Sequence, residues 1–151
     1  MNRSTAREIA VHFAFELAFS DESARQMLDR ELTEESFAQR SQDEPLYTQF
    51  PGPEERDYIT RLVLGVGGHG AELDGYIEKY AKGWRFYRID RVASAIMRVA
   101  MYEILYMPDI PNRAAINEAV EIAKGYLDEE VVKFINGILG SFVRGEVPEQ
   151  E

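Results

Sequence analysis

The sequence predicts an all-α protein whose helices form two groups of about three each. Strand signals are missing along the chain, whereas several stretches repeat apolar residues at three- and four-residue steps, the spacing of one buried helix face. The chain has 151 residues, which is enough for one compact domain. A fold of this size needs no disulfide or metal to hold it together.

The first helix is expected to begin at Ser4 or Thr5, because Glu8 follows Thr5 at the spacing of a capping box. Arg3 and Arg7 are one turn apart and are therefore expected to project together. Taken alone, two arginines at this position indicate a solvated helix end. The expected buried face consists of Ala6, Ile9, Ala10, Phe13 and Leu17.

A second, charged helix is expected from Asp21 to about Gln39. Three prolines and a glycine then break the helical pattern between Ser41 and Pro53, which predicts a loop. The loop is interpreted as a surface excursion in preference to a flap over a neighbouring surface. A third helix begins at Pro53, a residue suited to a first turn. The apolar residues expected on the second helix are Met27, Leu28, Leu32 and Phe37.

Glycines interrupt the third helix between Gly65 and Gly70. A phosphate-binding G-x-G-x-x-G loop would need a preceding strand, and the residues before this stretch are helical. The stretch therefore predicts a bend or a close helix crossing. His69 is interpreted as an exposed polar residue rather than a catalyst.

Five basic residues surround Trp84, the only tryptophan, at three-residue intervals. Such a mixture can hold single-stranded RNA by phosphate pairing and base stacking. It can equally be the solvated side of a connector whose aromatic residues enter the core, which is the interpretation favoured for Trp84 and Phe86. The basic residues are Lys79, Lys82, Arg85, Arg88 and Arg91.

The stretch from Arg88 to Met107 has the pattern of an amphipathic helix. Pro108 to Pro111 closes this helix, and Asn112 is expected to cap the next. The expected buried face consists of Ile89, Val92, Ala93, Ile96, Val99, Ala100, Ile104 and Met107, whereas Asp90, Arg91, Arg98 and Glu103 lie off it.

Residues 116–137 combine a helix, a tight corner and the start of a last helix. Asp128 is expected to cap that last helix, and Glu129 and Glu130 suit its first turn, where free N–H groups and the helix dipole favour negative charge. The expected buried residues are Ala115, Ile116, Ala119, Val120, Ala123 and Tyr126 before the corner, and Val131, Ile135, Ile138, Leu139 and Phe142 after it. Asn117, Glu121 and Lys124 share a different face of the first of these helices.

One side of the last helix is basic and polar, and glycines leave part of it without side chains. A glycine inside a helix costs about 1 kcal/mol relative to alanine, so two glycines on this side suggest that something approaches the backbone closely. Another helix of the same protein or a nucleic-acid strand would each explain them. With a nucleic-acid strand at this position, Phe134 would stack on a base and the nearby cations would pair with phosphates. The residues on this side are Lys133, Asn136, Gly137, Gly140 and Arg144.

Composition argues against several functions. The chain has no cysteine and only two histidines far apart in sequence, which leaves no basis for a zinc site or a thiol catalyst. No nucleophile lies beside a base, and no cofactor is indicated, so the chain is not expected to be an enzyme. The N-terminal stretch fits neither a signal peptide nor a membrane span, which predicts a cytoplasmic protein.

The formal net charge of -10 argues at first sight against binding to nucleic acid. Most of the acidity is local, because residues 20–58 carry eleven acids against four arginines and the tail is acidic. Binding to phosphates needs a local basic patch rather than a basic protein. A neutral or mildly basic face is therefore compatible with the composition.

Two linked motifs, INEAVEIAK at 116–124 and KFINGILG at 133–140, resemble the signature of the NusB family of bacterial transcription antitermination factors. The resemblance extends to Asp90-Arg91, to RVAMYE at 98–103, to Pro108–Pro111 and to Ala6-Arg7-Glu8. Two motifs in the right order and spacing are much more specific than one short pattern.

The resemblance implies a single NusB-like helical domain over residues 1–145, followed by an acidic tail at 146–151. Residues 1–82 would hold the N-terminal helices with the loop 41–53, and residues 83–145 the C-terminal helices. It also implies an RNA-binding adaptor in transcription antitermination. With NusE, a small-subunit ribosomal protein, the adaptor would bind boxA-type RNA of nascent ribosomal RNA transcripts in the elongation complex.

Carried over residue by residue, the resemblance implies RNA contacts at Arg3, Arg7, Glu130, Lys133 and Phe134, and partner contacts at Phe15, Asp90, Ala93 and Met97. The N-terminal arginines and the corner before the last helix are expected to share one platform for RNA. The family carries an arginine-rich element at the N-terminus, where this chain has two arginines. A helical protein-interaction module without RNA binding, a relative of the NusB-like domain ahead of some RNA methyltransferases, and a homodimer that hides its RNA face all stay open.

Overall fold

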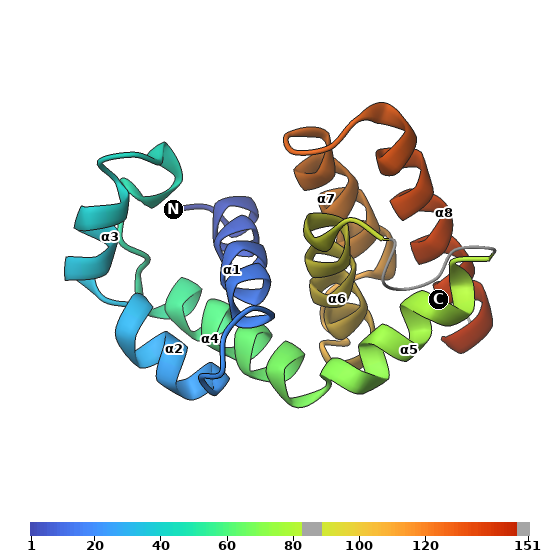
Figure 1. The fold of residues 1–151 in the computed structure, drawn as a ribbon, viewed down its shortest axis with the longest axis horizontal. Coiled ribbons are helices and arrows are strands. Elements are labelled where there is room, and N and C mark those ends of the chain that lie inside the picture. The colour runs from blue at the N-terminus through green and yellow to red at the C-terminus, as the bar shows by residue number, and fades with distance from the viewer. Residues whose placement is uncertain (83–88, 148–151) are drawn as a thin grey trace. The chain divides into compact units, whose positions relative to one another are not determined.

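A computed structural model describes residues 1–82 and 89–147, and all regular structure in these ranges is helical (Figure 1). The all-α prediction is confirmed: the described ranges hold eight α-helices, one short 3-10 helix and no strand. The interpretations of Trp84, Arg85, Phe86 and Arg88 lie outside the described residues. The helices form two units, residues 1–68 and 69–151.

The first unit contains α1 (Arg3–Leu17), α2 (Ala24–Glu31), α3 (Glu34–Arg40), the 3-10 helix η1 (Pro45–Tyr47) and α4 (Pro53–Gly68). Helices α1 and α4 pack along each other, and α2 packs against both. The core between them contains Ile9, Phe13, Ile59, Leu62 and Val63, none of which has exposed surface.

Helix α1 begins earlier than expected because Asn2 caps it. The Asn2 side chain accepts a hydrogen bond from the Thr5 backbone N–H at 2.8 Å. Asparagine caps helices as well as serine does, so Thr5 falls inside the first turn.

The expected helix from Asp21 to Gln39 is two helices, so that prediction was wrong. The α2 helix ends at Glu31 with Leu32 as its C-cap, and the Thr33 side chain caps the start of α3 by accepting a hydrogen bond from the Ser36 N–H at 3.1 Å. Acidic residues in the first turn of α3 reinforce this second start.

The stretch from Ser41 to Pro53 contributes to the core, which the surface-loop interpretation did not foresee. Its 3-10 helix carries Tyr47, which is 1% exposed. The Tyr47 ring lies edge-on to Phe37 at 5.1 Å and parallel to Phe13 at 6.4 Å. The Phe50 ring also lies edge-on to Phe37 at 5.2 Å, so two aromatic side chains of the loop fasten it to the helices around it.

The second unit contains α5 (Gly70–Tyr80), α6 (Arg91–Tyr106), α7 (Asn112–Lys124) and α8 (Glu129–Glu146). Helix α6 is its centre, because it packs against α5, α7 and α8. Burial on several sides explains why Arg98 and Glu103, expected off the buried face, are also buried. The Arg98 Nε lies 2.6 Å from Oδ1 of Asp74 on α5.

The glycine-rich stretch interrupts the helix at His69, between the end of α4 and the start of α5. The stretch therefore ends one helix and begins the next. Gly67 also marks a close approach within the first unit, since a Cβ there would lie 2.9 Å from the Ala24 Cβ on α2.

At the corner between α7 and α8, Asp128 caps α8 as expected, because its side chain accepts a hydrogen bond from the Val131 N–H at 3.1 Å. Several buried positions differ from the prediction, since Ile116 and Val120 are only half-buried and Ile122 is buried instead. Tyr126 is 45% exposed, because α7 ends at Lys124 and the helical period stops there. Val132 rather than Val131 is buried at the start of α8.

Candidate functional site

The two N-terminal arginines differ in exposure although both lie on α1. The Arg3 side chain is 46% exposed, its Nε lies 3.0 Å from Glu55 Oε2, and its guanidinium lies 3.9 Å from the ring centroid of Tyr58. Arg7 is only 5% exposed, and its guanidinium lies 5.6 Å from the same ring. Arg3 can therefore reach an incoming phosphate, whereas Arg7 mainly supports Tyr58 from inside.

Three expected RNA contacts lie together in the second unit, in the first turns of α8. Glu130 is exposed and Phe134 is half-buried. The Lys133 side chain is 76% exposed, with its Nζ 3.8 Å from Glu129 Oε1. An exposed ammonium group beside a partly open aromatic ring can pair with a phosphate and stack on a base.

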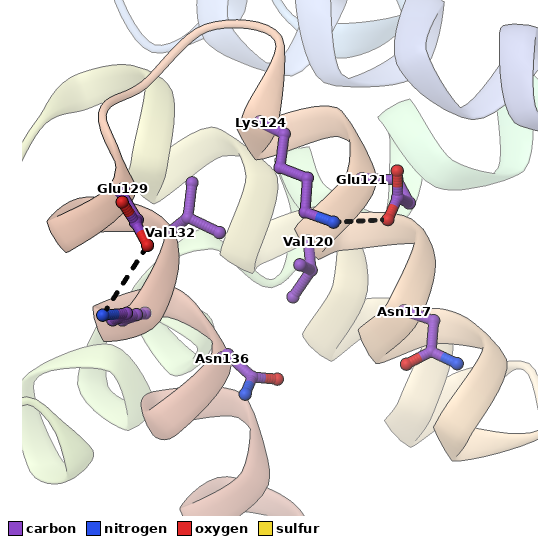
Figure 2. A pocket seen from close by; sticks show the side chains of 8 residues that line it. Asn117, Val120, Glu121, Lys124, Glu129, Val132 and Asn136 are labelled. Atoms are coloured by element: carbon purple, nitrogen blue, oxygen red, sulfur yellow. Dashed lines mark hydrogen bonds and ion pairs between the residues drawn. The ribbon is translucent and has the colours of Figure 1, made fainter.

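Helices α7 and α8 enclose a groove of about 540 Å3 beside these residues (Figure 2). Two valines contribute its apolar surface, and the other lining residues are charged or amide side chains. The lining consists of Asn117, Val120, Glu121 and Lys124 from α7 and Glu129, Val132, Lys133 and Asn136 from α8.

The lysines of the groove are both in ion pairs. Lys124 Nζ lies 2.9 Å from Glu121 Oε1, and Lys133 pairs with Glu129 as described above. Two lysines against two glutamates leave the groove neutral. Exposed pairs of this kind contribute about 0–1 kcal/mol, so either lysine can leave its partner for a phosphate.

The glycines of α8 lie beside the groove and differ from each other. A Cβ at Gly140 would lie 3.2 Å from a terminal guanidinium nitrogen of Arg144, which covers that glycine. At Gly137 no atom of the described structure lies within 4 Å of such a Cβ. A neighbouring helix of the same protein therefore does not explain Gly137.

Sequence reasoning placed Asn117, Glu121 and Lys124 on one helix face but did not pair this face with that of Lys133 and Asn136. The pairing depends on how α7 packs against α8, which helical periodicity does not contain. The short corner between the two helices was the available signal, because a short connection makes consecutive helices antiparallel neighbours.

A second surface group that sequence reasoning missed is aromatic. The ring of His69 lies 4.4 Å from Tyr106 and 5.7 Å from Tyr102, all in the second unit. The Tyr106 hydroxyl donates to Glu72 Oε1 at 2.7 Å, and this hydrogen bond, together with burial, raises the pKa of Tyr106 to about 12. Tyr106 is exposed and the other two rings are half-buried, and partly exposed rings at these spacings can also stack bases.

The expected partner contacts divide into reachable and covered residues. Phe15 is half-buried, with its ring 5.1 Å from that of Phe19, which is 61% exposed. Asp90 is exposed and caps α6 by accepting hydrogen bonds from the Val92 and Ala93 N–H groups. Ala93 and Met97 have no exposed surface.

Neither a metal centre nor a membrane span emerges from the part of the chain that the structure describes. Within residues 1–82 and 89–147, no three potential ligands gather to hold an ion. No helix there is both long and apolar enough to cross a membrane. Exposed cations, open rings and a polar groove on a helical scaffold are features of a binding protein of the all-α class.

Comparison with known proteins identifies this class further. Residues 4–144 match the model of the NusB family. The transcription antitermination protein NusB of Acetivibrio thermocellus is 39% identical over 144 residues, which cover 95% of this chain and 90% of that protein. The NusB of Clostridium kluyveri is 34% identical over 152 residues, covering 97% of each. The chain belongs to the NusB family of transcription antitermination proteins, which are not enzymes.

Solved structures agree on the fold. A structure of T. maritima NusB superposes with a TM-score of 0.80 at 28% identity, covering 98% of this chain and 94% of the other. A crystal structure of antitermination factors NusB and NusE in complex with double-stranded RNA matches with a TM-score of 0.75 at 20% identity, covering 94% and 96%. The family assignment made from the two sequence motifs is confirmed.

Proposed function

We propose that this protein is an RNA-binding adaptor that holds boxA-type RNA of nascent ribosomal RNA transcripts together with NusE in the elongation complex. The observation that carries the proposal is the exposed Lys133 next to the half-buried ring of Phe134, within the family motif at the start of α8. The similar fold found in complex with NusE and RNA supports it. Because the proposed RNA is a nascent transcript, the activity is proposed to take place in the cytoplasm.

Each proposed RNA contact has a distinct role. Lys133 and Arg3 pair with phosphates, Arg3 by exchanging Glu55 for the RNA. Phe134 stacks on a base, and the exposed Glu130 accepts a hydrogen bond from a base amino group. Arg7 holds the Tyr58 ring under Arg3 and adds positive potential.

NusE is proposed to meet the reachable partner residues, Phe15 and Asp90. The exposed Phe19 beside Phe15 enlarges the apolar surface available to a partner. Ala93 and Met97 contribute by fixing the shape of α6, since they have no exposed surface of their own.

A second function, a protein-interaction module without RNA binding, is favoured by the charge balance. The net charge is -10, and both lysines of the α7–α8 groove are already paired with glutamates. Fluorescence anisotropy of labelled boxA-type RNA, with and without NusE and at two salt concentrations, separates the two functions. Absence of binding under all four conditions would eliminate the RNA-binding adaptor.

Phe134→Ala is expected to weaken RNA binding by about 1–3 kcal/mol, the usual contribution of one stacked base. Thermal stability should stay nearly unchanged, because Phe134 is half-buried rather than part of the core. Phe19→Ala, measured without NusE, is the matched control, since it also removes an aromatic ring outside the core and should leave RNA affinity unchanged. A large drop in the melting temperature of Phe134→Ala would show that the ring serves the core instead.

A further inference from the structure

The α7–α8 groove contains two amide side chains that the structure itself does not use. Asn117 on α7 and Asn136 on α8 both line the groove, and the Asn136 amide points from α8 toward α7 (Figure 2). Among residues 1–82 and 89–147, neither amide has a hydrogen-bond partner. Asparagine on an exposed helix face gains nothing for the helix itself. These two side chains are therefore available to a ligand.

The chemistry of the groove suits a nucleobase better than a bare phosphate. Each amide offers one acceptor and two donors, which can match the edge of an unstacked base. Val120 and Val132 supply apolar surface for the face of a base. The groove is neutral overall, so it does not attract a polyanion by charge alone.

The lysines at the groove connect it to the proposed path of the RNA. Lys133 lines the groove and is followed directly by Phe134 in α8. The Lys124 and Lys133 side chains are 58% and 76% exposed, so they can contact phosphates on either side of a base that enters between them.

We propose that the α7–α8 groove takes in one unstacked base of the bound RNA and that Asn117 and Asn136 recognise its edge. This inference rests on the proposed RNA-binding function and adds where sequence preference arises. Lys133, Phe134 and Arg3 supply affinity for any RNA, whereas the two asparagines discriminate among bases.

The test uses the full chain with NusE and a panel of boxA-type RNAs in which each base is replaced in turn. Dissociation constants are measured for the wild type, Asn117→Ala, Asn136→Ala and Asn136→Asp, the last of which keeps the shape but loses the donors. Gln39→Ala, an exposed amide on α3, is the matched control. Melting temperatures establish that each variant is folded.

The wild type is expected to discriminate at one position of the RNA by about 5- to 150-fold, and the groove variants to lose that discrimination while binding the replaced RNAs as before. Equal weakening toward every RNA in the groove variants would overturn base recognition. Unchanged RNA binding with reduced affinity for NusE would also overturn it, because the groove would then be occupied by a protein segment. Absence of RNA binding by the wild type would instead overturn the proposed function itself.

Discussion

Arg40 links three elements of the first unit through two carboxylates. Its terminal nitrogens donate to both oxygens of Glu16 on α1 at 2.9 and 2.7 Å, and its Nε and Nη2 donate to Glu31 Oε1 on α2 at 2.9 and 2.7 Å. The guanidinium also lies 5.0 Å from the ring centroid of Tyr47. A segment that looks merely acidic in sequence is therefore partly an organised ion cluster.

The pKa of Glu31 makes this cluster sensitive to acid. Burial raises the pKa of this carboxyl, but hydrogen bonds from Arg40 and Ser36 and the charges of Arg40 and Arg30 outweigh burial and lower it below the ordinary 4.5. A carboxyl with a depressed folded pKa contributes stability above its unfolded pKa, and this stability is lost as the pH falls through the folded pKa.

We therefore expect the free energy of unfolding to fall as the pH drops below about 4.5. Glu31→Gln should be less stable at pH 7 and should show a shallower loss in acid, because it has no charge left to lose. Urea unfolding at closely spaced pH values measures both. Glu78→Gln, at an exposed position of α5, is the control, and equal slopes for wild type and Glu31→Gln would contradict the assignment.

Single residues were predictable where their signal is local. Asp128 was identified as a cap because aspartate followed by two glutamates is a start signal that needs no distant contact. The burial of Arg7 was not predictable, since it depends on Tyr58 of α4, far along the chain.

Among the helices, α6 and α8 were predicted to within a few residues because their apolar periodicity is strong. The split of α2 from α3 was missed, since charged residues continue across Leu32 and hide the new start at Thr33. The α7–α8 groove was missed for another reason: each helix shows its own polar face, but only packing brings the two faces together.

Gly137 allows a test of α8 in which stability and binding change in opposite directions. A methyl group at this position meets open space, so Gly137→Ala should stabilise the protein by about 0.5–1 kcal/mol through helix propensity. If RNA approaches the backbone here, the same methyl group should weaken binding. Thermal unfolding and anisotropy measure the two effects.

Gly75→Ala provides a matched control for this experiment. Gly75 lies within α5, and a Cβ there also meets nothing within 4 Å. It should raise stability by a similar amount and leave RNA binding unchanged. Unaltered RNA affinity in Gly137→Ala would show that no ligand comes close to this part of α8.

At the scale of the whole molecule, few cations are available to RNA in a chain with a net charge of -10. Each phosphate neutralised on a single strand contributes about -0.7 to the slope of log K against log salt, so the exposed cations Arg3, Lys124 and Lys133 together predict a slope of about -2. Affinity should then fall roughly 15-fold between 50 and 200 mM salt.

Anisotropy titrations across this salt range measure the slope. Lys133→Gln should make it shallower by about 0.7, whereas Arg25→Gln, at an exposed position on α2, should not change it. A slope of about -4 or steeper would mean that further cations take part, with the basic run from Lys79 to Arg91 as the first place to look.

The burial of Tyr47 also affects how the chain meets proteases. A protease that cuts after aromatic residues would find Tyr47 covered in the native state and could cleave there only during local unfolding, at a rate that reports how often the loop opens. Exposed Asp43 and Glu44 lie a few residues earlier, open to a protease that cuts after acidic residues. The same loop would thus be resistant to one enzyme and susceptible to another.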